Sequence, residues 1–356
     1  MKFKFSVSLL TLGLLGVSAQ AQSSWEIYGR ANVSLDQLDN GAGYKELNLV
    51  SNASRLGFRG QKKFDSGLTG IWQLESAISI TNDATSNQLL GKRDTFVGIQ
   101  DAWGTLRVGH FDTPMKVARD PANLFGDQLG DMRNITRASL RFDERPNNLI
   151  EYKTPSFNGW VAAIAYAAHE GMTNTDPAVT TSSVAGQNGM MGYSLTYRQG
   201  NLLLAYAGES YENKASNGKR DGNRLAASYK VRPDLRLVGF FQKGNDKATA
   251  TAGTANDKSA TVTGYGLEYN LNPKSVIKFA SFKNDAKILN GDSTQNALGF
   301  EHLLDKQMRV HVTCASVKNG TAAKVQPWVQ GRDLTGLASA AGATAKGLSV
   351  GLRYDF

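Results

Sequence analysis

The chain has 356 residues, 37 glycines, one cysteine and a net charge of +9 at pH 7. The single cysteine excludes an intrachain disulfide, which argues against a small disulfide-stabilised secreted module. The positive charge is compatible with binding to nucleic acid, with an anionic membrane surface or with an interior that favours anions. The signal peptide described next argues against a nucleic-acid partner, because an exported protein rarely meets nucleic acid.

The first 21 residues have the pattern of a secretory signal peptide. Lys2 and Lys4 precede an apolar run over residues 7–17, and residues 18–21 end in the A-x-A cleavage pattern. Cleavage there removes two lysines and no acidic residue, so residues 22–356 keep a net charge of +7. No later apolar stretch approaches the ~20 residues of a membrane-spanning helix. We therefore expect an exported mature chain.

The two ends of the mature chain show the same alternation. Apolar or small residues occupy every second position from Trp25 to Leu35, and again from Leu348 to Phe356. A period of two predicts strands with one apolar and one polar face. In a soluble sandwich the apolar faces of two sheets meet, whereas in a membrane barrel they contact lipid and the polar faces line the interior.

The links between strands separate these two folds. Sixteen strand-like runs are joined by links that alternate between short and long. The short links lie at 64–68, 101–104, 155–158, 199–200, 232–234, 271–274 and 304–306. The long links lie at 37–46, 81–90, 112–146, 169–190, 211–222, 244–260, 284–294 and 317–345. Outer-membrane barrels have short turns at one end and long loops at the other, so residues 22–356 predict an all-β, transmembrane, antiparallel up-and-down β-barrel of sixteen strands, wide enough for water.

Charged residues at interior positions are the candidate functional groups. The strand pattern places Arg55 and Arg59 on one face, and it also turns Arg30 and Arg93 inward. An arginine that faces lipid near the bilayer centre costs ~2–4 kcal/mol, so the interior is favoured. The longest link, 112–146, has the length of a functional or disordered loop. It carries the remaining candidates, Asp120, Asp127, Asp131 and Arg145.

Catalytic and metal-binding patterns are missing from the sequence. Its four histidines, at positions 110, 169, 302 and 311, have neither H-x-x-x-H spacing nor a cysteine partner nearby. No nucleophile–base set is recognisable at a rim of the barrel. We predict neither an enzyme nor a cofactor.

Five segments of the early strands resemble one family. They are SRLGFRG at 54–60, GIWQLES at 70–76, RDTFVG at 93–98, GTLRVG at 104–109 and NNLIEY at 147–152. In this order they resemble the general-diffusion porins of Neisseria- and Burkholderia-type Gram-negative bacteria. Tyr354 and Phe356 resemble the aromatic-x-Phe end that the outer-membrane assembly machinery reads. The resemblance covers essentially the whole mature chain.

The resemblance implies a homotrimer of barrels in the bacterial outer membrane, in contact with its lipids. Each pore would pass small hydrophilic solutes and ions by passive diffusion, narrowed by an infolded third loop, 112–146. Arg55 and Arg93 would lie at this constriction, and Arg145, Arg30, Arg59 and the three aspartates are further candidates. Because rings of charge set ion preference, the positive mature chain predicts a moderate preference for anions. A channel specific for one nutrient is the alternative, although the aromatic residues fall mostly on the apolar face.

Overall fold

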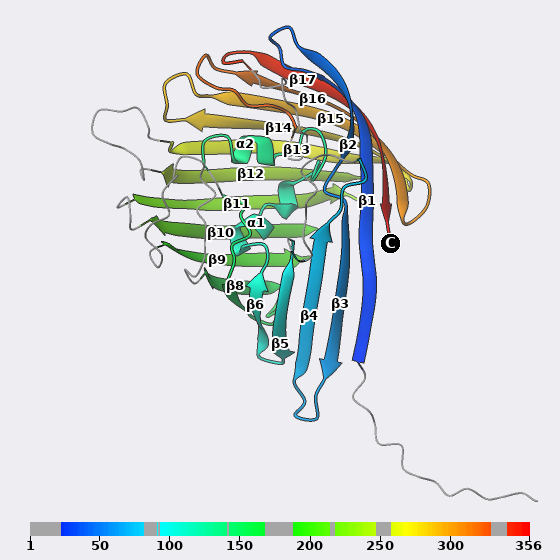
Figure 1. Cartoon of the computed structure of the whole chain (residues 1–356), viewed down its shortest axis with the longest axis vertical. Helices are drawn as coiled ribbons and strands as arrows, with labels where there is room; N and C mark the ends of the chain where they lie inside the picture. Colours follow the sequence, from blue (N-terminus) through cyan, green and yellow to red (C-terminus); the bar gives the residue numbers. More distant parts are fainter. Residues whose placement is uncertain are drawn as a thin grey trace, which may run out of the picture.

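The computed structural model describes residues 23–81, 91, 93–140, 142–167, 188–213, 218–246, 258–328 and 340–356. Helices in these ranges are confined to α1 (Pro114–Val117), η1 (Asp120–Ala122) and α2 (Arg133–Thr136), which all lie between β6 and β7 (Figure 1). None of the helices in the described ranges is long and apolar enough to cross a membrane.

The same residues form seventeen strands, all antiparallel to their partners. The strands are β1 (Ser23–Asp39), β2 (Lys45–Ser51), β3 (Arg55–Lys63), β4 (Thr69–Ala77), β5 (Thr95–Asp101), β6 (Gly104–His110), β7 (Leu149–Lys153), β8 (Trp160–Ala167), β9 (Asn188–Gln199), β10 (Leu202–Asn213), β11 (Gly218–Arg232), β12 (Leu235–Asp246), β13 (Ala260–Asn272), β14 (Ser275–Ala286), β15 (Ser293–Leu303), β16 (Met308–Asn319) and β17 (Thr344–Asp355).

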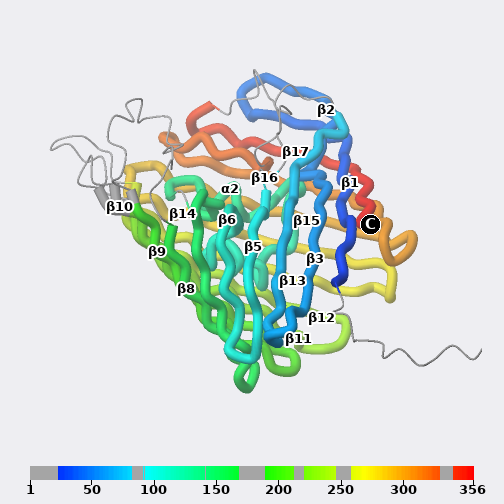
Figure 2. The backbone as a smooth tube through the Cα atoms, turned by 60° about the horizontal axis from the view of Figure 1, so that its bottom comes forward, coloured from blue at the N-terminus to red at the C-terminus, as the bar shows by residue number. Residues whose placement is uncertain are grey.

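The sheet closes on itself. From β3 onward each strand pairs with the next, and β17 returns to pair with β1, beside which it lies in Figure 2. Both β2 and β3 pair with β1, one along each half of its length, so together they form one interrupted strand. The fold is therefore a closed antiparallel barrel of sixteen strands, and this prediction is confirmed.

Short polar side chains hold the interruption between β2 and β3. Ala53 has φ +51°, a left-handed conformation that takes the backbone out of the strand ladder. The Asn52 amide Nδ2 donates to Ser34 Oγ at 2.7 Å, and the Asn32 N–H donates to Ser54 Oγ at 2.9 Å. Side chains in the break and on β1 thus bridge the gap in the ladder.

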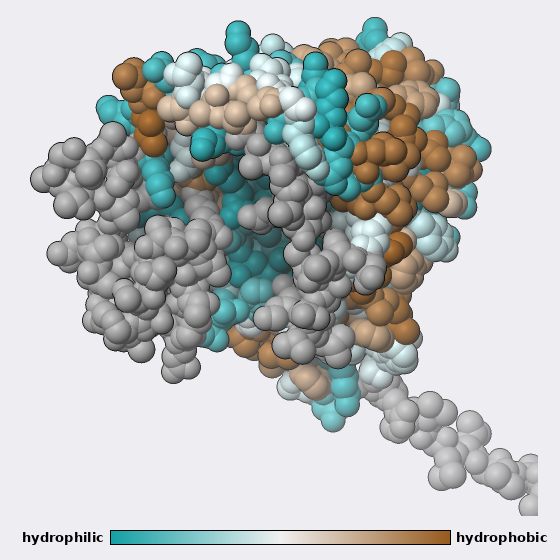
Figure 3. Space-filling model, turned by 45° about the horizontal axis from the view of Figure 1, so that its top comes forward, coloured by the Kyte–Doolittle hydropathy of each residue, from teal (hydrophilic) through white to brown (hydrophobic). Residues whose placement is uncertain are grey.

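Exposure along the strands is inverted relative to a soluble protein. On β17, Val350 is 52% exposed on the outer face, whereas Ser349 beside it is 1% exposed on the inner face. Figure 3 shows a hydrophilic hollow next to an outer surface rich in hydrophobic residues. Lipid on the outside and polar groups inside satisfy both faces, which explains why the alternation predicts a membrane barrel.

The strands run past the predicted loop limits at most of the long links, and two of these links show the difference clearly. β1 runs to Asp39 and β2 starts at Lys45, so the first link is shorter than the predicted 37–46. β10 and β11 likewise reach Asn213 and Gly218, inside the predicted loop 211–222. These limits were wrong because hydrogen-bonded pairing continues through polar residues that lie beyond the apolar band. Residues 82–90 and 169–187 of the predicted long links lie outside the described residues.

The last residue completes the closure. The Phe356 N–H donates to Gly29 O at 3.1 Å, and the Gly29 N–H donates to Phe356 O at 2.9 Å. The ring also lies over Gly29, where a Cβ atom would come within 2.4 Å of Phe356 Cζ. Tyr354 stacks on the same ring, with centroids 5.8 Å apart.

Deleting Phe356 should lower the yield of folded barrel sharply, because two closing hydrogen bonds and the cover of Gly29 are lost together. The measurement is the heat-modifiable fraction in outer-membrane extracts, separated by gel mobility with and without boiling. Phe356→Leu keeps the backbone bonds and should retain more folded protein than the deletion. Equal yields of the deletion variant and the wild type would contradict this role.

Candidate functional site

The segment 111–148 lies inside the barrel (Figures 1 and 2). Its helix α1 contacts β8 to β10, η1 contacts β10 to β12, and α2 contacts β14 and β15. Most of its large apolar side chains are buried against the wall, namely Phe111, Met115, Leu124, Phe125, Leu129, Met132, Ile135, Leu140 and Phe142. Two glycines of the wall leave room for these side chains. A Cβ atom at Gly222 would lie 2.6 Å from the Phe142 ring, and one at Gly299 would lie 2.6 Å from the Phe125 ring.

The tip of this internal segment meets two of the candidate arginines. Asp127 Oδ2 accepts from Arg55 Nη2 at 3.1 Å and from Arg30 Nη1 at 3.3 Å. Arg30 Nε also donates to Asp355 Oδ1 at 2.8 Å. The carboxylate therefore joins β1 and β3 to a loop that is 72 residues further along the chain than Arg55.

A second carboxylate links the next arginine to the same group. Glu75, on β4, pairs with Arg93 and lies 3.8 Å from the Nη1 of Arg55. It also accepts a hydrogen bond from the Tyr28 hydroxyl at 3.0 Å. Three guanidinium groups thus follow one another around the wall from β1 to the start of β5, bridged by Asp127 and Glu75. We call Arg30, Arg55, Arg93, Asp127 and Glu75 the arginine row.

Arg145 forms a separate group where the internal segment returns to the wall. Its Nε donates to Asp94 Oδ1 at 2.6 Å, and its Nη2 lies 2.5 Å from Asp112 Oδ1. Lys116 reaches the same Asp112 oxygen at 2.7 Å. Asp94 directly follows Arg93 in the sequence, so this group is the neighbour of the arginine row.

Among the described residues, the remaining candidates form no ion pair with the arginine row. Arg59 is 54% exposed and pairs with Glu26 on β1, beyond the ladder pair of Arg30 and Arg55. Asp131 is buried and accepts the N–H groups of Asp127 at 2.9 Å and Arg133 at 2.8 Å, so it shapes the tip of the segment. Asp120 starts η1 and is exposed to the interior of the barrel.

The charges of the row fix the ionisation of Asp127. Burial by itself raises the pKa of this carboxyl, but Arg55, Arg93 and Arg30 outweigh it and hold the pKa below its ordinary value. For Asp120 the balance is reversed. Desolvation of the carboxyl by the surrounding protein raises its pKa to about 6, and the nearby Arg119 only partly offsets that effect.

Sequence reasoning missed a buried anchor on the opposite wall. Arg224 on β11 is fully buried and donates from Nη1 to Asp143 Oδ1 and to Met115 O, both at 2.5 Å. Its Nε and Nη2 donate to Gln242 Oε1 at 3.1 and 2.5 Å. Arg119 also lies 3.4 Å from Asp143. The alternation of β11 turns Arg224 inward, but nothing in the sequence pairs it with an aspartate 81 residues away.

Among the described residues, no three histidine, cysteine, aspartate or glutamate side chains converge as a metal site would require. The charged groups instead form ion pairs between the wall and the internal segment. Such an arrangement can sort ions and dipolar solutes by charge.

Known proteins resemble the chain over nearly its full length. A family model described as Gram-negative porin matches residues 8–322. Outer membrane porin protein 32 of Delftia acidovorans is 28% identical over 370 residues, covering 98% of this chain and 99% of the relative. Major outer membrane protein P.IB of Neisseria meningitidis serogroup B is 27% identical over 382 residues, covering 99% of this chain and 100% of the relative. The solved anion-selective porin from Comamonas acidovorans superposes with a TM-score of 0.80 at 24% identity, covering 94% and 100% of the two chains.

Proposed function

The chain belongs to the Gram-negative porin family, and from this premise we propose that its water-filled channel prefers anions through the arginine row. As an outer-membrane porin it lets small hydrophilic solutes and ions diffuse passively through the barrel. The solved porin with the same fold is described as anion-selective, and the positive net charge of this chain agrees with that preference.

One observation carries the proposal. The row sets the guanidinium groups of Arg30, Arg55 and Arg93 against the carboxylates of Asp127 and Glu75, which gives the row itself one net positive charge. Asp355, the other partner of Arg30, is neutralised in turn by Arg353. A passing anion is attracted by the arginines and repelled by the carboxylates, so the preference should be moderate. Arg145 and Lys116 face Asp94 and Asp112 beside it and leave the local balance unchanged.

The test is a reversal potential across a planar bilayer under a potassium chloride gradient. The wild type should show the sign for chloride, and the value should shrink as total salt rises from 0.1 to 1 M, because the Debye length falls from ~10 Å to ~3 Å. A cation-selective wild type would contradict the proposal. A channel specific for one nutrient would instead show a conductance that one solute blocks at low concentration.

The pH dependence should report on Asp120. Its pKa of about 6 means that lowering the pH from 7.5 to 5 protonates Asp120 while Asp127 stays ionised, which removes one negative charge from the internal segment. Chloride preference should therefore rise toward acid pH. The contribution of Asp120 is the difference between the wild type and Asp120→Asn, which should show a smaller rise. If the wild type and Asp120→Asn change their chloride preference equally with pH, Asp120 is not the cause of the change.

The mature protein is proposed to assemble as a homotrimer after cleavage of residues 1–21. The N-terminal segment has the pattern of a signal peptide, and Tyr354 and Phe356 supply the aromatic end through which the assembly machinery would recognise the chain. N-terminal sequencing should begin at Gln22, and mass measurement in mild detergent should give three chains. An intact N-terminus would contradict the proposed cleavage, and a monomer would contradict the proposed trimer.

A further inference from the structure

Tyr28 lies on β1, two residues before Arg30, and touches the arginine row through Glu75. The strand register places Tyr28 of β1, Gly57 of β3 and Glu75 of β4 next to one another across the ladder. The tyrosine side chain crosses over the glycine, and its hydroxyl donates to Glu75 Oε2 at 3.0 Å. One side-chain hydrogen bond therefore spans three strands of the wall.

Gly57 provides the space for this crossing. A Cβ atom at Gly57 would lie 2.4 Å from Tyr28 Cζ and 2.6 Å from the hydroxyl oxygen. A larger residue at this position would therefore push the ring away from Glu75. The Arg59 guanidinium also lies over the ring, 4.7 Å from its centroid, but Arg59 is more than half exposed and holds the ring less firmly.

The two carboxylate oxygens of Glu75 have separate partners. Oε1 pairs with Arg93 and lies 3.8 Å from Arg55 Nη1. Oε2 accepts the hydroxyl proton of Tyr28. Because Glu75 is only 6% exposed, water cannot readily replace a donor that this oxygen loses.

The hydroxyl limits how strongly Glu75 binds Arg55. Without it, Oε2 would be a buried acceptor that lacks a donor, and the guanidinium of Arg55 is close enough to supply one. Both oxygens of Glu75 could then bind Arg55, as bidentate arginine–carboxylate pairs do. Arg55, whose Nη2 donates to Asp127 at 3.1 Å, would be less available to a passing anion.

We propose that Tyr28 is a positioning residue for ion selection, which holds Glu75 so that the positive charge of Arg55 stays available to anions in the pore. The proposal rests on the proposed anion preference and adds to it a neutral residue that acts through Glu75. A purely structural role is the alternative, because aromatic rings also cover glycines in sheets without any part in function.

A second tyrosine of the wall provides the matched control. Tyr193 of β9 crosses Gly208 of β10 in the same way, and its hydroxyl donates to Asn223 Oδ1 on β11 at 3.0 Å. Tyr193 is 44% exposed and faces outward, since its neighbour Met190 is buried on the inner face. This tyrosine shares the geometry of Tyr28 but contacts no charged group of the pore.

The experiment measures reversal potentials under a potassium chloride gradient at 0.1 M, together with heat-modifiability as a check of folding. Tyr28→Phe keeps the ring over Gly57 and removes only the hydroxyl. Its chloride-to-potassium permeability ratio should fall roughly twofold below that of the wild type. Gly57→Ala, which displaces the ring, should lower the ratio as well. Tyr193→Phe should keep the wild-type ratio.

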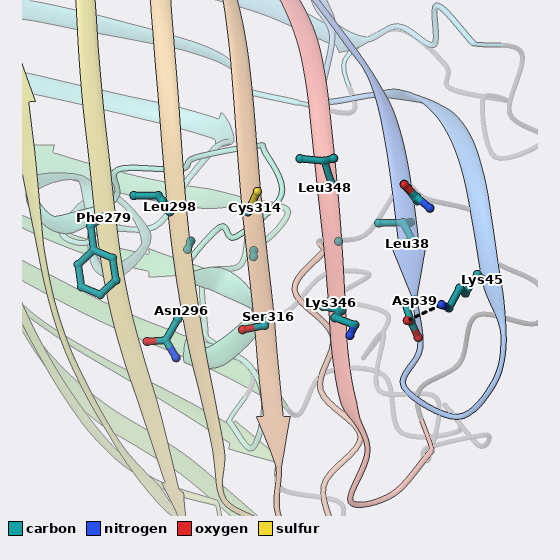
Figure 4. A pocket seen from close by; sticks show the side chains of 14 residues that line it. Leu38, Asp39, Lys45, Phe279, Asn296, Leu298, Cys314, Ser316, Lys346 and Leu348 are labelled. Carbon is teal, nitrogen blue, oxygen red and sulfur yellow. Dashed lines mark ion pairs between the residues drawn. The ribbon is translucent and has the colours of Figure 1, made fainter. Parts of the chain in front are cut away.

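A double variant tests whether Tyr28 acts through Glu75. Glu75→Gln removes one negative charge from the row and should raise the ratio. Adding Tyr28→Phe should then change nothing further, because the group that Tyr28 positions has lost its charge. Lys346→Gln is the charge control. Figure 4 shows Lys346 on β17 at a pocket of the outer wall, where loss of one charge should leave the ratio unchanged.

Three outcomes would overturn the proposal. An unchanged ratio in Tyr28→Phe would show that the hydroxyl has no part in selection. An equal fall in Tyr193→Phe would show a general effect of removing a hydroxyl from the wall. An equal fall with and without the charge of Glu75 would show that Tyr28 acts by another route. These comparisons between variants do not depend on the sign of the wild-type potential, so they fail separately from the proposed anion preference.

Discussion

Replacing both Arg55 and Arg93 with glutamate should turn a chloride-preferring pore into one that prefers potassium. The arginine row holds three guanidinium groups against two carboxylates, so two charge reversals take its net charge from +1 to −3. Interactions at this range are weakly screened at 0.1 M salt, where the Debye length is ~10 Å. The row should therefore dominate the ion preference in dilute salt.

The measurement is again the reversal potential under a potassium chloride gradient, at 0.1 M and at 1 M. Its sign should invert in the double variant, and the inversion should weaken at 1 M. Arg59→Glu is the matched control, because Arg59 shares the strand and the inward face but pairs with Glu26 away from the row. A double variant that keeps the wild-type potential, or an Arg59 variant with the same effect, would show that the filter lies elsewhere.

Arg224→Met should release the internal segment from the wall without unfolding the barrel. Arg224 binds the Asp143 side chain and the Met115 carbonyl, two points at opposite ends of the segment. Removing one partner of a buried ion pair typically costs about 3–5 kcal/mol, and the loss here should be smaller because Arg119 still lies 3.4 Å from Asp143. The strand ladder does not depend on this contact. The expected result is a larger and noisier single-channel conductance with normal heat-modifiability.

Two further variants make this result specific. Arg224→Met combined with Asp143→Leu removes both buried charges and should recover part of the wild-type conductance. Arg232→Met removes an exposed arginine of the same strand that pairs only locally with Asp234, and it should leave conductance unchanged. If Arg224→Met conducts as quietly as the wild type, the anchor does not hold the segment.

The sequence predicts the barrel well because its main determinant is local. Period-two alternation and the contrast of short and long links follow from neighbouring residues, and these residues set the strand number. The interruption at Asn52 and Ala53 was not foreseen, since an asparagine in a strand has no single meaning. Its side-chain partners, Ser34 and Asn32, become visible only when β1 and β2 are paired.

The candidate site was less predictable. Alternation turns Arg30, Arg55 and Arg93 inward, and the structure gathers these three into one row. Glu75 escaped notice because an inward carboxylate resembles any solvated interior residue until its distance to an arginine is known. Arg224 and Asp143 depend on how a long segment crosses the barrel, and local sequence does not encode that path.

The pairing of the first strand with the last has a consequence for how the chain can be cut and rejoined. Arg30 and Asp355 are hydrogen-bonded although 325 residues separate them, so both ends of the chain meet on one edge of the wall. Every fragment that lacks either end leaves two unpaired strand edges, which are templates for aggregation. A circular permutant that joins Phe356 to Ser23 through a short linker, and opens within a long link, would keep every ladder intact. The linker would then join β1 and β17 covalently. Pairing of these two strands, which otherwise requires the two ends of the chain to meet, would become a local folding step.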